Sequence, residues 1–235
     1  MLIVRPDFER RVDLPGAGPC RRPVDIDRSR TSFSDLVSLR VYSFAGGVRI
    51  DGEAEGDEVF IVLMRGAADI AISQDGRQVG AFSLRREGGS RVAYMPPHAS
   101  YRLTAVTDCD IAYARAEPLV AELPEVRGFA PVGNRLDVTG HATGMELALS
   151  TVRAGEEFGL AQHDRAPQRF VHIRADDEMT ATIAGERLGD WDSVALGDGE
   201  RALLEVQTGT ADMLTISASR YRNAASESWA PTGVR

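Results

Sequence analysis

Residues 58–78 read EVFIVLMRGAADIAISQDGRQ, and this stretch decides the fold of the first half of the chain. An apolar run rich in Val, Ile and Leu ends at Gly66, and a second run covers residues 68–74. Short runs of this kind, separated by turn residues, are typical of β-strands. Asp75-Gly76 then lies between two such runs, which predicts a tight hairpin.

Runs of the same kind recur along the whole chain at a spacing of about 8–12 residues, which is the pattern of an all-β sandwich or barrel. Long amphipathic helical patterns are absent. The further predicted strands cover residues 37–44, 90–97, 101–107, 109–117, 145–152, 168–175, 179–185, 192–197, 202–207 and 211–219.

The two halves of the chain can be laid on each other at a period of roughly 105–110 residues, so the sequence predicts two copies of one β-module. Residues 124–134 contain two prolines and little periodicity, and they are interpreted as part of the connection. We expect a first barrel over residues 1–120, a connection over 121–144 and a second barrel over 145–235. The matching stretches are 41–47 with 149–155, 58–66 with 168–176, and 109–117 with 211–219.

Composition narrows the range of partners. The chain has 235 residues and a net charge of −8, and an acidic surface repels nucleic acid. No apolar stretch approaches the roughly 18 residues of a membrane span and no signal peptide is evident, so a cytoplasmic location is expected. Cys20 and Cys109 lie far apart, which argues against a zinc knuckle or a disulfide framework.

Several segments resemble a cupin barrel, and the two copies together resemble a bicupin. The resemblance is to the family of 5-deoxy-glucuronate isomerase and its relative 4-deoxy-5-hexulose-uronate isomerase. It implies two tandem cupin barrels of the double-stranded β-helix type, aldose–ketose isomerisation of a uronate-type sugar acid, and self-association into a homo-oligomer. The segments that carry it are residues 2–6, Val41-Tyr42 with Gly46 or Gly47, residues 58–66 and residues 92–105.

The same resemblance implies a divalent metal in the second barrel, held by two histidines, a glutamate and a later histidine. In this chain those positions fall on His163, Arg165, Gln168 and Arg201. Arginine is a permanent cation without a lone pair to offer, so it repels a metal ion. We therefore expect no metal and no other cofactor, and a pocket that favours a small anion, with Arg165 and Arg201 as a cradle for a carboxylate.

The run at residues 168–175 leaves its orientation open. With a period of two, one face carries Gln168, Phe170, His172 and Arg174, and the other carries Arg169, Val171 and Ile173. If the first face points inward, the barrel contains a polar ligand pocket; if it points outward, that face is an ordinary polar one. On the inward alternative, His163 and His172 are the candidate bases. The predicted substrate-binding residues are Arg165, Gln168, Arg174 and Arg201.

Two functions are compatible with these residues. The first is isomerisation of a uronate-type sugar acid, in which a base moves a proton through an enediol and arginine holds the substrate carboxylate. The second is a catalytically degenerate, metal-free bicupin that binds a small anion or has a structural or regulatory role. A metal-dependent cupin dioxygenase is disfavoured by the missing ligands. Motifs of nucleotide-binding enzymes, serine hydrolases and zinc proteases are absent from the sequence.

Overall fold

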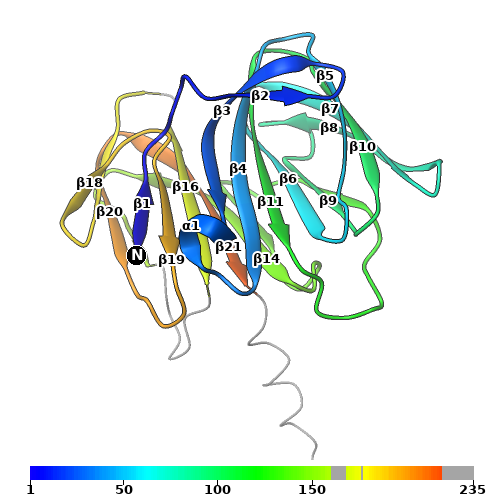
Figure 1. Ribbon diagram of the computed structural model, residues 1–235. Coiled ribbons are helices and arrows are strands. Elements are labelled where there is room, and N and C mark those ends of the chain that lie inside the picture. Colours follow the sequence, from blue (N-terminus) through cyan, green and yellow to red (C-terminus); the bar gives the residue numbers. More distant parts are fainter. Residues whose placement is uncertain (160–167, 176, 219–235) are drawn as a thin grey trace, which may run out of the picture.

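The computed structural model describes residues 1–159, 168–175 and 177–218 of the chain. These residues form 21 strands and one short helix, α1 (Arg28–Thr31), which confirms the all-β prediction. The strands build two barrels that lie side by side (Figure 1). Within the described ranges, no helix has the length and hydropathy that crossing a membrane requires.

The N-terminal barrel consists of a seven-stranded and a four-stranded sheet. Its strands are β2 (Arg11–Leu14), β3 (Gly18–Asp27), β4 (Leu36–Phe44), β5 (Arg49–Glu53), β6 (Glu58–Arg65), β7 (Ala67–Gln74), β8 (Arg77–Arg85), β9 (Val92–Met95), β10 (Ser100–Ala105), β11 (Cys109–Ala116) and β12 (Arg127–Phe129). The sheet orders are β12-β9-β6-β11-β4-β3-β2 and β5-β10-β7-β8.

The C-terminal barrel repeats this plan with a six-stranded and a four-stranded sheet. Its strands are β1 (Leu2–Val4), β13 (Arg135–Val138), β14 (Met145–Arg153), β15 (Glu157–Gly159), β16 (Arg169–Ala175), β17 (Thr180–Ile183), β18 (Glu186–Leu188), β19 (Ser193–Leu196), β20 (Leu203–Thr208) and β21 (Thr210–Ala218). The sheet orders are β1-β19-β16-β21-β14-β13 and β15-β20-β17-β18.

The predicted hairpin is confirmed between β7 and β8. Its two turn residues, Asp75 and Gly76, have φ angles of 51° and 74°. Positive φ at both central positions gives a turn whose twist matches that of the flanking strands, and Asp-Gly is among the few pairs that adopt it readily.

The strand pairing differs from the predicted boundaries of the first barrel, both near residue 1 and near residue 120. β1 pairs with β19 and so belongs to the sheet of the C-terminal barrel, although residues 1–120 were expected in the first barrel (Figure 1). The connection over 121–144 also contains two strands. β12 joins β9 of the N-terminal barrel, and β13 joins β14 of the C-terminal barrel. The chain therefore crosses between the barrels twice. The strands near these crossings supply hydrogen bonds to backbone groups at sheet edges that would otherwise be unpaired.

Both faces of the long central strands are buried, against different partners. In β6, Val59 and Ile61 lie in the apolar core inside the N-terminal barrel. Phe60 and Val62 point the other way, into an apolar cluster that also contains Leu214 and residues of other C-terminal strands. The two large sheets thus pack on each other, and this explains why β6 is a continuous apolar run rather than an alternating one.

Two buried ion pairs join the barrels across this interface. Arg91 of the N-terminal barrel lies 2.6 Å from Asp212 of the C-terminal barrel, and Arg174 lies 2.8 Å from Asp110 in the opposite sense. All four side chains are about 95% buried. Asp110 and Asp212 occupy equivalent positions in the two repeats, so each copy of the module offers the same aspartate to an arginine of the other.

Removing one member of such a pair leaves its partner charged and buried, which costs about 3–5 kcal/mol in measured cases. We expect Asp110→Ala to lower the free energy of unfolding by about 3 kcal/mol, because Arg174 then keeps only its more exposed partner, Asp190. Urea denaturation measures this change. The matched control is Asp137→Ala, which breaks an exposed pair with Arg135 and should cost less than about 1 kcal/mol. Equal effects of the two substitutions would contradict the role of the buried pair.

Candidate functional site

Strand β16 settles the orientation that the sequence left open. Val171 and Ile173 lie in the apolar core inside the C-terminal barrel, whereas Phe170 lies in the cluster between the barrels. The face shared by His172 and Arg174 therefore points toward the N-terminal barrel. Neither alternative describes this face: it does not line a pocket inside the barrel, and it is not an ordinary polar surface, because it is buried against the N-terminal barrel.

Gln168 links the two barrels instead of facing a barrel cavity. Its Oε1 accepts hydrogen bonds from the backbone N–H groups of Asp35 and Leu36, at 2.9 and 3.4 Å. Its Nε2 donates to Ser34 and to Asp198, at 3.0 and 3.2 Å. With both ends of the amide engaged in this way, the predicted substrate-binding role of Gln168 has no support in its placement.

Glu58, the counterpart of Gln168 in the first repeat, makes the equivalent contacts in the opposite direction. Its carboxylate accepts hydrogen bonds from the backbone N–H groups of Thr143 and Gly144, at 2.6–3.0 Å, and from the Tyr94 hydroxyl at 2.7 Å. Glu58 and Gln168 begin the matching stretches 58–66 and 168–176, and each holds the segment that leads into a strand of the other barrel.

His172 is fully buried in the interface, with an exposed fraction of 0%. Its Nδ1 lies 2.9 Å from the Ser193 hydroxyl, and its ring contacts Trp191 edge-on. Burial, with a smaller contribution from the Arg174 charge, lowers the pKa of His172 to about 3. The imidazole is therefore neutral at physiological pH, but a side chain with no exposed surface is badly placed to act as the predicted base.

Arg174 also serves the interface. Its guanidinium donates to Asp110 at 2.8 and 3.0 Å and to Asp190 at 2.5 and 2.6 Å, and it stacks 4.6 Å above the Trp191 ring. A guanidinium held by two carboxylates and a ring is compensated in charge. The structure therefore gives Arg174 a structural environment, and its predicted substrate-binding role remains without support.

The remaining predicted residues are not brought together in the part of the chain that the structure describes. Arg201 is exposed in the turn between β19 and β20. His163 and Arg165 lie outside the described residues, in the connection from β15 to β16. Their predicted roles stay predictions.

A different arginine, which the sequence analysis did not single out, faces the inside of the C-terminal barrel. Arg169 alternates with Val171 and Ile173, so it lies on the inner face of β16 at one end of the barrel. It is half-buried, and its Nε donates to the Ser217 hydroxyl at 3.0 Å. The sequence signal for Arg169 was its spacing of two and four residues from Val171 and Ile173, which places all three on one face of a strand.

Arg169 belongs to a polar row that crosses three neighbouring strands. Glu146 of β14 pairs in register with Ser217 of β21, and Ser217 pairs with Arg169 of β16. Strands lie about 4.8 Å apart, so Glu146 and Arg169 stand about 10 Å apart across the row. One step deeper, the Thr215 hydroxyl is buried and has no hydrogen-bond partner among the described residues.

The charge of Arg169 is not balanced by a close carboxylate. Among the described residues, no acidic group lies within ion-pair distance of its guanidinium. Burial lowers the pKa of Arg169, and the more distant Glu146 charge only partly opposes that shift. A half-buried guanidinium without an ion pair is costly unless an anion binds to it.

The N-terminal barrel offers no comparable position in its described interior. Its core is filled by tyrosines and other apolar residues, including Tyr101 and Tyr113, whose rings lie 6.1 Å apart. The arginine at its end, Arg115, is already paired with Glu55 and Asp57, both at 2.6 Å. The mouth of the C-terminal barrel is therefore the better candidate site.

Metal ligation does not fit the described residues of this mouth. Glu146 offers the row's one carboxylate, and the guanidinium and two hydroxyls beside it are poor ligands for a divalent ion. The positive charge of Arg169 also opposes the approach of such an ion. The groups of three or more His, Cys, Asp or Glu that could hold an ion are likewise absent from the described ranges.

Comparison with known families gives a match in the first part of the chain. A family model described as KduI/IolB matches residues 18–144, which is more than half of the chain. The chain belongs to the KduI/IolB family. The matched region covers most of the N-terminal barrel and the connection, whereas the polar row lies in the C-terminal barrel, beyond the matched residues. None of the curated proteins matches the chain significantly in sequence.

Solved structures share the fold of this KduI/IolB member. An IolB-like protein from Salmonella typhimurium LT2 superposes with a TM-score of 0.64 at 17% identity, over 93% of this chain and 92% of that one. An oxalate decarboxylase from Bacillus subtilis superposes with a TM-score of 0.66 at 11% identity, over 92% of this chain and 77% of that one. These similarities support the cupin fold and, at such low identity, the fold alone.

The buried imidazole generates a pH prediction. Unfolded His172 binds a proton below about pH 6.5, whereas the folded protein keeps it neutral down to about pH 3. Between these values the unfolded state binds more protons, so His172 removes up to about 1.4 kcal/mol of stability for each pH unit below 6.5. We expect His172→Leu to lose stability less steeply than the wild type when urea unfolding is followed from pH 7 to pH 5. Parallel curves for the two proteins would show that His172 does not carry this dependence.

Proposed function

We propose that this KduI/IolB family member isomerises a uronate-type sugar acid and that Arg169 holds the substrate carboxylate at the mouth of the C-terminal barrel. The observation that carries the proposal is the half-buried guanidinium of Arg169, which has no ion-pair partner among the described residues. Guanidinium matches a carboxylate in a bidentate contact, and the family suggests a sugar isomerase.

The polar row supplies groups for the proton transfer. In an aldose–ketose isomerisation a base removes the proton from C2, the C1 carbonyl oxygen gains a proton to give an enediol, and a proton returns to C1 as the O2 hydroxyl becomes the ketone. We assign the base to Glu146, because its carboxylate is on the same inner face as Arg169, two strands away. The unpartnered Thr215 hydroxyl, one step deeper, donates to the sugar carbonyl oxygen.

Substitutions in the row test this assignment. We expect Arg169→Gln to lower kcat/KM by about 10–100-fold, mainly through KM, since a charge-assisted contact is worth roughly 1.5–3 kcal/mol. We expect Glu146→Gln to lower kcat by at least about 100-fold. Turnover of 5-deoxy-glucuronate is followed by proton NMR in D₂O, where isomerisation also exchanges the C2 proton with solvent.

The matched control is Arg153→Gln, which removes an exposed arginine at the opposite end of β14 and should leave the rate unchanged. Wild-type kinetics in Arg169→Gln and Glu146→Gln would remove the polar row from the site.

We further propose that the reaction needs no divalent metal. Dialysis against EDTA should leave the rate within twofold of the untreated protein, and elemental analysis should find less than one transition metal per chain. A tightly bound stoichiometric metal, together with activity that EDTA abolishes, would contradict this proposal.

A second candidate function is binding of a sugar acid without turnover. It is favoured by Gln168, which stands at a family ligand position but is engaged in the interface through both ends of its amide. Calorimetry separates the two functions. Saturable binding of 5-deoxy-glucuronate that Arg169→Gln weakens, without NMR exchange at high protein concentration, would favour the binding function over the isomerase.

A further inference from the structure

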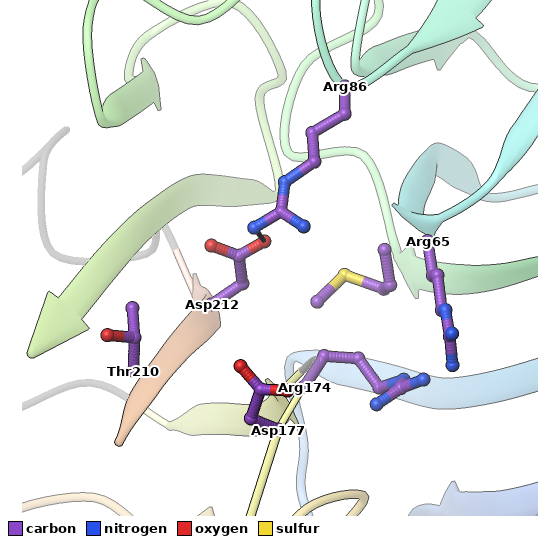
Figure 2. A pocket seen from close by; sticks show the side chains of 7 residues that line it. Arg65, Arg86, Arg174, Asp177, Thr210 and Asp212 are labelled. Atoms are coloured by element: carbon purple, nitrogen blue, oxygen red, sulfur yellow. Dashed lines mark ion pairs between the residues drawn. The ribbon is translucent and has the colours of Figure 1, made fainter. Parts of the chain in front are cut away.

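Charged side chains cluster at two places outside the polar row, and the two differ in charge balance. The first is the junction of the barrels, where Figure 2 shows arginines and aspartates converging, among them Arg174 and Asp212. Arg91 also pairs with Asp212, and Arg174 pairs with Asp110 and Asp190. With these partners counted, arginines and aspartates are equal in number, so the junction has no excess charge for a ligand to balance.

The second place is a group of three arginines around one aspartate, which we call the Asp25 cluster: Asp25, Arg10, Arg22 and Arg40. Asp25 of β3 pairs in register with Arg40 of β4, and Arg40 pairs with Tyr113 of β11. Tyr113 lies in the apolar core inside the N-terminal barrel. The cluster therefore lies on the same face of the large sheet, at the margin of that core. Arg22 belongs to β3, and Arg10 comes from the segment between β1 and β2.

One buried carboxylate is shared by all three guanidiniums. The Asp25 side chain is 6% exposed, and it lies 2.8 Å from the Arg22 guanidinium and 3.2 Å from that of Arg40. Arg10 pairs with the same carboxylate. Among the described residues, no other acidic group lies within ion-pair distance of these arginines, and Asp25 pairs with no further cation. The cluster therefore carries two positive charges that no ion pair balances.

The charges in the surroundings do not remove this excess. Asp27, which caps α1, acts on Arg40 only from beyond ion-pair distance. Arg30 offsets it, since its Nη1 donates to the backbone carbonyl of Asp25 at 3.0 Å. The two acidic side chains that precede Arg10, at positions 7 and 9, are exposed and form no ion pair within the described structure, and water and salt screen their charge.

Several N–H groups of the cluster have no acceptor. Arg40 contacts Asp25 through Nε, and neither of its terminal nitrogens makes a hydrogen bond within the described residues. The Nε of Arg22 is buried without a hydrogen-bond partner, and its guanidinium lies 5.9 Å from the centre of the Tyr42 ring. The side chains of Arg10 and Arg40 are 39% and 28% exposed, so an anion can reach them from solvent. A guanidinium edge with two free N–H groups matches a carboxylate or a phosphate.

The sequence around the cluster is the basic part of an acidic chain. Residues 1–40 contain eight arginines and six acidic residues, whereas the whole chain has a net charge of −8. A locally positive region on an acidic protein concentrates small anions.

We propose that the Asp25 cluster binds a small oxyanion, held by the terminal N–H groups of Arg40 together with Arg10. The oxyanion is free phosphate or the phosphate or carboxylate group of a metabolite. Because Arg10 lies in the segment that crosses from the C-terminal barrel to the N-terminal one, the bound anion also stabilises this crossing. The site is separate from the polar row and does not depend on the proposed isomerase.

Inorganic phosphate is the probe, with the ionic strength held constant by chloride. Arg169→Gln is titrated beside the wild type, because it lacks the other candidate contact for an anion. In Arg169→Gln we expect phosphate to raise the midpoint of thermal unfolding saturably, and calorimetry to give one site per chain. A parallel series with acetate separates a carboxylate preference from a phosphate preference.

Arg40→Gln should weaken phosphate binding at least about tenfold, which corresponds to the loss of one charge-assisted contact. The fold should survive, because Asp25 keeps Arg10 and Arg22, and circular dichroism checks this.

Asp25→Asn should change binding in the opposite direction. It should lower the midpoint of thermal unfolding in chloride, because three guanidiniums lose their shared partner. It should nevertheless bind phosphate at least about threefold more tightly, because the anion no longer meets the carboxylate. A cluster with a purely structural role would lose stability in this variant and show no tighter binding.

The control is Arg102→Gln, which removes an exposed arginine of the same barrel that has a carboxylate of its own, Asp51. It should bind phosphate as the wild type does. Phosphate binding that Arg40→Gln leaves unchanged would overturn the proposal, as would unchanged affinity in Asp25→Asn, or stabilisation by phosphate and acetate no greater than that by chloride. Turnover of 5-deoxy-glucuronate should persist in Arg40→Gln, so the two sites are tested independently.

Discussion

The face-to-face packing of the two large sheets is the constraint on which the rest of this molecule depends. It buries the outer faces of β6 and β16 as completely as the inner ones, and it places charged groups from each barrel against the other. A charge inside such an interface must find a partner, because desolvation of an isolated charge costs several kcal/mol. The pairs of Arg91 with Asp212 and of Arg174 with Asp110 meet that requirement, and they also fix the register of one barrel on the other.

The duplicated module explains why these contacts occur in related pairs. Asp110 and Asp212 are equivalent in the repeat, as are Glu58 and Gln168, and each reaches across to the opposite barrel. A position that the family resemblance implies as a metal ligand can therefore form hydrogen bonds across the interface in this chain. Gln168 is such a position, since its amide has both a donor and an acceptor and satisfies backbone and side-chain groups at once.

The two barrels have diverged at their ends. In the N-terminal barrel, aromatic rings fill the interior and Arg115 is paired with two carboxylates. In the C-terminal barrel, Arg169 and Thr215 face an apolar interior. Within the described residues, Arg169 has no ion-pair partner and the Thr215 hydroxyl has no hydrogen-bond partner. An unmatched polar group in a barrel costs stability, and a binding site is the usual reason for that cost to be retained. This difference between the barrels supports the proposal that the binding site lies in the second one.

The sequence by itself determined the strand rhythm, the Asp75-Gly76 hairpin, the repeat and the resemblance to the family, because each depends on local turn chemistry or on a pattern that repeats along the chain. Only the tertiary structure decided which face of β16 is inside. Aliphatic and polar residues alternate along that strand, but both of its faces are buried, so neither polarity nor period could choose between them. The choice moves the proposed site from His172 and Arg174 to Arg169. It depends on partners such as Asp110, 64 residues away in the chain, which only the packing of one barrel on the other brings into contact.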